Sequence, residues 1–124
     1  MDARRSVLIV DESDESREVL RTVLEHRGVR ILEASAAAEG LDLARQHQPD
    51  LIVLDLELDS SPPELPHELA THATHATPLV LLGSARRKVA HPQVGEFVAK
   101  PYHYAPLVRR IEELLGTQSL STQC

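Results

Sequence analysis

Leu51-Ile52-Val53-Leu54-Asp55 is the stretch that decides the fold, because four apolar residues run without a polar break and then stop at an acid. An unbroken apolar run of this length is typical of a strand buried on both faces of a parallel sheet. Pro49-Asp50, just before it, is turn chemistry that starts the strand. Ligands of open α/β sheets bind at the carboxyl edge, so we expect Asp55 to lie at a site there and not in the core.

Four further stretches have the character of strands. They are residues 7–10, 29–34, 79–82 and 96–99. The first and third are continuous apolar runs, which predicts burial on both faces. In the second, Arg30 stands between Val29 and Ile31, and charge at alternate positions favours an edge strand with one wetter face.

Helices are expected between these strands. Apolar residues at helical spacing predict helices over residues 13–27, 36–48 and 105–115, and a weaker pattern indicates a short one over 64–75. Ser13 can cap the first helix and Gly28 can end it in a left-handed conformation. Pro49 stops the second. Gly116 closes the last, which leaves residues 117–124 as a disordered polar tail.

This alternation of strands and helices predicts an α/β domain over residues 1–116, with a doubly wound parallel sheet and right-handed crossovers. A chain of 124 residues is one domain by size, and its net charge of -6 argues against non-specific binding to nucleic acid or to acidic membranes. The single cysteine, Cys124, excludes a disulfide framework. Without a signal peptide or an apolar run of membrane length, we expect a cytoplasmic protein.

The carboxyl ends of the predicted strands gather acids and a lysine. If the strands at 7–10, 51–55, 79–82 and 96–99 are neighbours, the residues brought together are Asp11, Glu12, Asp55, Ser84 (or Gly83) and Lys100. Three close carboxylates cannot all stay ionised without a counter-charge, and Mg²⁺ with its preference for oxygen ligands supplies one. Lys100 suits a phosphoryl oxygen. Asp55 would then be a nucleophile toward phosphorus, giving an aspartyl phosphate.

In their order and spacing, four segments resemble the receiver domains of bacterial two-component response regulators, the CheY-like family. They are VLIVDE at 7–12, PDLIVLD at 49–55, PLVLL at 78–82 and FVAKP at 97–101. The resemblance spans roughly residues 6–116. It implies a five-stranded, flavodoxin-like sheet of order 2-1-3-4-5. It also implies a signalling module and not an enzyme, with a sensor histidine kinase or phosphotransfer protein as partner, and it allows a homodimer.

The resemblance also implies a role for each site residue. Asp55 would be the phosphoacceptor of the histidine kinase, Lys100 would pair with the phosphoryl group, and Phe97 would be the switch aromatic. The Mg²⁺ ligands would be Asp11, Glu12, Asp55 and the main-chain carbonyl of Glu57.

Four features depart from the family pattern. Glu12 is one methylene longer than the usual Asp, and Leu58-Asp59 with a proline-rich loop replaces the usual Met-Pro. The switch hydroxyl is expected at Gly83, so that Ser84 lies one residue late. The segment after Ser84 is short, which predicts that the family's fourth helix is shortened or missing.

Other interpretations stay open. Phe97 is also explained by ordinary strand packing, and Ser84 by a plain turn. The chain is either a phosphoacceptor switch or a degenerate receiver, acting as a phosphorylation-independent interaction or dimerisation module. The run Asp55-Leu56-Glu57-Leu58-Asp59 prompts a third hypothesis, a Mg²⁺-dependent phosphatase with an aspartyl nucleophile.

Overall fold

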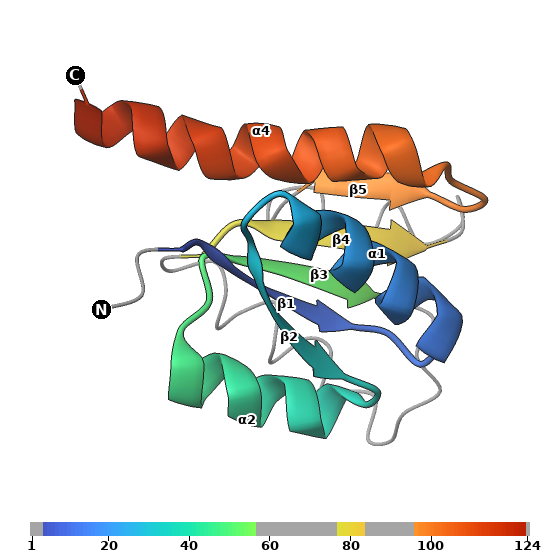
Figure 1. The fold of residues 1–124 in the computed structure, drawn as a ribbon. Helices are drawn as coiled ribbons and strands as arrows, with labels where there is room; N and C mark the ends of the chain where they lie inside the picture. The colour runs from blue at the N-terminus through green and yellow to red at the C-terminus, as the bar shows by residue number, and fades with distance from the viewer. Residues whose placement is uncertain (1–3, 57–76, 84–95, 124) are drawn as a thin grey trace.

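The fold is an alternation of strands and helices around one parallel sheet (Figure 1). The computed structural model describes residues 4–56, 77–83 and 96–123, and for 117–123 the backbone alone. The elements are β1 (Ser6–Val10), α1 (Asp14–His26), β2 (Arg30–Ala34), α2 (Ala37–His47), β3 (Leu51–Asp55), β4 (Leu79–Gly83), β5 (Glu96–Ala99) and α4 (Tyr104–Gln123).

The five strands are all parallel and lie in the order β2-β1-β3-β4-β5. This confirms the predicted doubly wound sheet and its strand order. β2 lies at one edge, as the charge at Arg30 predicted, and β3 lies at the centre. In Figure 1, α1 and α4 cover one face of the sheet and α2 covers the other.

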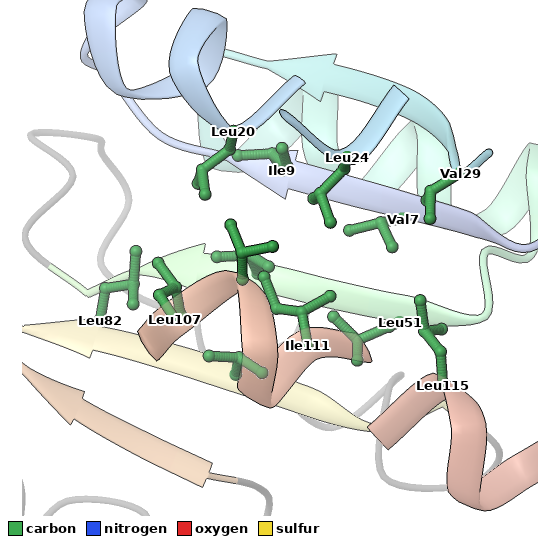
Figure 2. Packing of buried hydrophobic residues seen from close by; sticks show 13 residues of the cluster. Val7, Ile9, Leu20, Leu24, Val29, Leu51, Leu82, Leu107, Ile111 and Leu115 are labelled. Atoms are coloured by element: carbon green, nitrogen blue, oxygen red, sulfur yellow. The ribbon is translucent and has the colours of Figure 1, made fainter. Parts of the chain in front are cut away.

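The core consists of two apolar layers, one on each face of the sheet. Val7 and Ile9 of β1 face α1 and α4, where Leu20 and Ile111 pack against them (Figure 2). The alternate residues of β1 belong to the other layer, beneath α2. Successive side chains of a strand point to opposite faces, so two covered faces require the unbroken apolar runs seen in the sequence.

The ends of α1 follow the predicted signals. The Ser13 side chain accepts a hydrogen bond from the Ser16 N–H at 3.2 Å, as a helix cap does. At the other end Gly28 has a φ of 85°, and the Val29 N–H donates to the Leu24 carbonyl at 3.0 Å. This bond turns the chain directly from α1 into β2.

The connection from α2 to β3 also follows the sequence. The buried face of α2 includes Ala37, Leu41 and Ala44. Gln48 ends the helix in a left-handed conformation with a φ of 47°. Beyond Pro49, the Asp50 carboxylate accepts the Ser6 N–H at 2.8 Å, which ties the start of β3 to the start of β1.

The last helix departs from the prediction. It was expected to close at Gly116, but α4 continues to Gln123, so the backbone of residues 117–123 is helical where a disordered tail was predicted. A glycine inside a helix costs about 1 kcal/mol relative to alanine, which weakens a helix without ending it. Buried Leu107, Ile111 and Leu115 already anchor α4 to the sheet.

Two predicted features lie outside the described residues. They are the short helix over 64–75 and the segment in which the family's fourth helix is expected to be shortened or missing. Within the part of the chain that is described, no helix combines the length and the hydropathy that a membrane crossing requires.

Candidate functional site

Two acids from separate parts of the chain meet at the carboxyl edge of the sheet. Asp11 directly follows β1, and Asp55 is the last residue of the neighbouring strand β3. Their exposed fractions are 3% and 5%, and they are the buried charged residues of the described chain. Burying carboxylates is costly unless they are hydrogen-bonded or paired with a cation, so this pair needs an explanation beyond packing.

Lys100 supplies one positive charge to this pair. Its Nζ donates to Asp55 Oδ1 at 2.8 Å, and its main-chain N–H donates to the Gly83 carbonyl at 2.8 Å. The second bond continues the β4–β5 pairing, so the lysine follows directly from the end of β5. The peptide bond from Lys100 to Pro101 is cis. The predicted convergence of Asp11, Asp55 and Lys100 is therefore present.

Burial and the neighbouring charges both act on the ionisation of Asp11. Burial raises the pKa of Asp11, and the neighbouring Asp55 carboxylate raises it further. The Ser13 N–H, which donates to Asp11 Oδ1 at 2.9 Å, and the Lys100 charge both lower that pKa. The net effect is a raised pKa, with burial as its largest cause.

An open pocket of about 780 Å³ lies over these residues. Glu12 is exposed and belongs to the lining, together with Asp11, Asp55 and Lys100. Within the described residues, no three acidic, histidine or cysteine side chains form a ready-made metal cage. Mg²⁺ needs no such cage, because it is bound through one or two carboxylates with waters and a phosphate. Asp11 and Asp55 are a donor set of this kind.

The end of β4 carries no side chain at the place expected for the hydroxyl. A Cβ on Gly83 would lie 3.3 Å from Leu56 Cβ and 3.7 Å from Phe97 Cε2. Phe97 is half-buried and packs against the core layer under α2. The other predicted residues of this region, Ser84 and the Glu57 carbonyl, lie outside the described residues.

Two aromatic residues of the pocket lining were not predicted. Tyr102 and Tyr104 both line the pocket, with ring centroids 5.5 Å apart and an interplanar angle of 84°. The Tyr104 hydroxyl and Ser16 Oγ are hydrogen-bonded at 3.3 Å, which joins the start of α4 to α1. Burial raises the pKa of Tyr102. The available signal was that both tyrosines closely follow Lys100 in a chain with one other aromatic residue.

The sequence matches the response regulator receiver domain family over residues 7–112. It is 33% identical over 123 residues to the KDP operon transcriptional regulatory protein KdpE of Escherichia coli, covering 94% of this chain and 54% of that protein. It is 37% identical over 54 residues to the polar-differentiation response regulator DivK of Brucella ovis, covering 44% of each. The chain thus spans about half the length of the curated relatives it matches.

Solved structures agree with this match. A response regulator receiver modulated diguanylate cyclase from Pelobacter carbinolicus superposes with a TM-score of 0.76 at 27% identity, over 97% of this chain and 99% of that one. The Vibrio cholerae chemotaxis protein CheY4 has the same fold, with a TM-score of 0.76 at 23% identity over 90% and 99% of the two chains. From the match over most of its length, the chain belongs to the response regulator receiver domains of two-component systems.

Proposed function

We propose that this receiver domain is a phosphoacceptor, with Asp55 as the residue that takes the phosphoryl group from a histidine kinase or phosphotransfer protein. The observation that carries the proposal is the buried Asp55 carboxylate, 2.8 Å from Lys100 Nζ at the floor of an open pocket. A buried carboxylate beside a cation and open to a substrate on one side is suited to nucleophilic attack.

The transfer is a single displacement at phosphorus. An Asp55 carboxylate oxygen bonds to the phosphorus of a phosphohistidine while the P–N bond breaks. The electron pair leaves with the imidazole nitrogen, which takes up a proton. The Lys100 ammonium would donate to the oxygens that gather charge, and its hydrogen bond of 2.8 Å to Asp55 supports this role.

A divalent cation completes the charge balance. Asp11 and Asp55 would hold Mg²⁺, with Glu12 at the rim of the pocket and the main-chain carbonyl of Glu57 as further ligands. When bound, Mg²⁺ offsets the negative charge of the carboxylates and of the phosphoryl oxygens. The burial of Asp11 and Asp55 side by side, with Lys100 paired to Asp55, supports this assignment, because adjacent carboxylates repel each other and a cation between them relieves that repulsion.

The test is incubation with a small phosphodonor and Mg²⁺, followed by intact-mass measurement. We expect a gain of one phosphoryl group that is absent without Mg²⁺ and absent in Asp55→Asn. The matched control is Asp42→Asn, which changes an exposed carboxylate on α2 and should be phosphorylated normally. An unchanged mass in the folded native protein would rule the proposal out. Steady turnover of a phosphate ester well beyond one equivalent would favour the phosphatase alternative.

A second candidate function rests on Gly83. Without a hydroxyl at this residue, the step that would couple Asp55 to Phe97 lacks the side chain that the family uses. The alternative is therefore a phosphorylation-independent interaction or dimerisation module. It predicts that partner binding survives Asp55→Ala, whereas the phosphoacceptor proposal predicts that this substitution abolishes any phosphodonor-dependent change in binding.

A further inference from the structure

Arg17 is an internal cation of α1 that reaches toward the acidic loop. Its side chain is only 13% exposed. One guanidinium nitrogen, Nη1, donates to the main-chain carbonyl of Asp11, while Nη2 donates to the Asp14 carboxylate. The remaining nitrogen, Nε, donates to Glu33 Oε1 at 3.2 Å. All three nitrogens of the planar fork are thus used, in a geometry that a lysine cannot reproduce.

The carbonyl contact completes the fixation of Asp11. On the other side of the residue, the Asp11 N–H donates to the Ala34 carbonyl of β2 at 3.0 Å. The carboxylate is oriented by the Ser13 N–H, which donates to Oδ1 at 2.9 Å. Hydrogen bonds thus hold the main-chain N–H, the main-chain carbonyl and Oδ1 of Asp11. Because these three groups are fixed, the direction in which Oδ2 points is fixed as well.

Glu33 holds the guanidinium from the neighbouring strand. Its Oε1 accepts from Arg17, and its Oε2 accepts from Arg21 Nη1 at 2.8 Å. Arg21 lies one turn further along α1, and its side chain is 40% exposed. The two arginines therefore share one carboxylate, but the hydrogen bond to the Asp11 main-chain carbonyl comes from Arg17. This difference makes Arg21 a matched comparison for Arg17.

The charge balance allows an arginine beside a cation site. A bare guanidinium next to Asp11 would repel an incoming divalent cation. Here two carboxylates, Asp14 and Glu33, contact the guanidinium and offset its charge. Arg17 can therefore hold the Asp11 carbonyl without adding net positive charge to the pocket.

We propose that Arg17, oriented by Glu33, is a positioning residue that presets the acidic loop at Asp11 for binding a divalent cation. The inference rests on the proposed function, because it concerns the cation site of that same reaction. Residues that orient a metal ligand through a hydrogen bond typically change metal affinity by about 10–100-fold when they are replaced. A residue that serves only the stability of α1 would leave the affinity unchanged.

The experiment is a titration of the whole chain with Mg²⁺ alone, followed by amide chemical shifts in NMR spectra. For Arg17→Met we expect the Mg²⁺ dissociation constant to rise about tenfold. Glu33→Gln should shift it in the same direction by less, because the guanidinium stays but loses a charged partner. Arg21→Met, which removes the same type of charge from the same carboxylate, should stay close to the native value.

Three outcomes would count against a positioning role for Arg17. A native Mg²⁺ affinity in folded Arg17→Met would overturn the inference, as would an equal loss in Arg21→Met, since that would reflect the ion-pair network in general. If Arg17→Met does not fold, Arg17→Lys replaces it in the same titration, because lysine keeps the positive charge but lacks the planar guanidinium that binds three partners. If the native protein itself does not bind Mg²⁺, the proposed cation site fails together with this inference.

Discussion

Lys100 Nζ and Asp55 Oδ1 lie 2.8 Å apart although 45 residues separate them in the sequence. β4 lies between their strands in the sheet, so the lysine side chain reaches past the end of that strand. The last residue of β4 is Gly83, whose carbonyl accepts the Lys100 N–H. The contact thus depends on three strand ends that stop at the same level of the sheet.

Replacing Lys100 by methionine should destabilise the metal-free protein. The substitution removes the ammonium that is hydrogen-bonded to buried Asp55 and lowers the pKa of Asp11, and removing one member of a buried pair is costly. Since the Lys100 side chain is 31% exposed, water screens part of this effect, and we expect a loss of about 1–2 kcal/mol in the free energy of unfolding. Urea denaturation measures it. The control is Arg109→Met, at an exposed residue of α4. If Lys100→Met lowers the free energy of unfolding no more than Arg109→Met does, the stabilising role of Lys100 is contradicted.

Asp11→Asn should stabilise the metal-free protein at neutral pH. The pKa of Asp11 is raised above its usual 3.8, first by burial and then by Asp55. For a raised carboxyl pKa, the stabilising contribution is complete below the unfolded-state value and is lost as the pH rises through the folded-state value. Asparagine stays neutral and can still accept the Ser13 N–H. We expect a gain on the order of 1 kcal/mol at pH 7, the usual size of a single-site effect.

The measurement for Asp11→Asn is urea denaturation in EDTA at several pH values. The gain should shrink toward acidic pH, where the native Asp11 is itself neutral. A gain that is the same at pH 4 and pH 7, or a loss at pH 7, would show that burial of charge at Asp11 is not the cause.

Replacing Gly28 or Gly116 by alanine should change the free energy of unfolding in opposite directions. Gly28 has a φ of 85°, which strains any residue with a Cβ, so Gly28→Ala should lower the free energy of unfolding by about 1 kcal/mol. Gly116 lies inside α4, and an added Cβ would meet no atom within 4 Å, so Gly116→Ala should raise the free energy of unfolding by about 0.5–1 kcal/mol. Thermal denaturation of both variants checks this. Destabilisation by Gly116→Ala would contradict the continuation of α4 through that residue.

A Cβ at Gly83 should couple to Leu56. The ideal Cβ lies 3.3 Å from Leu56 Cβ, which is a tight contact. We expect Gly83→Ala to cost less stability in a Leu56→Ala background than in the native chain, with a coupling of about 0.5 kcal/mol or more. A double-mutant cycle in urea measures this coupling. Additive effects of the two substitutions would indicate that the end of β4 adjusts without resistance.

Much of the fold was accessible from the sequence because the signals were local. The unbroken run Leu51–Asp55 predicted a central buried strand, and Ser13 and Gly28 marked both ends of α1. The convergence of Asp11 and Asp55 with Lys100 followed from one rule, that parallel strands end at the same edge of a sheet.

What the sequence did not reveal depends on contacts between distant side chains. Nothing in the spacing of Arg17 and Glu33 indicates that they meet, because their contact depends on how α1 lies against β2. The bond between Tyr104 and Ser16 is of the same kind. At Gly116 the local signal pointed the wrong way, because anchoring by Leu107, Ile111 and Leu115 outweighs the weak helix propensity of one glycine.

The most direct test of the central claim is to locate the phosphoryl group. After reaction with a small phosphodonor and Mg²⁺, borohydride reduces an aspartyl phosphate to homoserine, which peptide mass spectrometry identifies by position. We expect homoserine at residue 55, and none when Mg²⁺ is withheld. Homoserine at another aspartate, or none anywhere in the folded chain, would contradict the central claim.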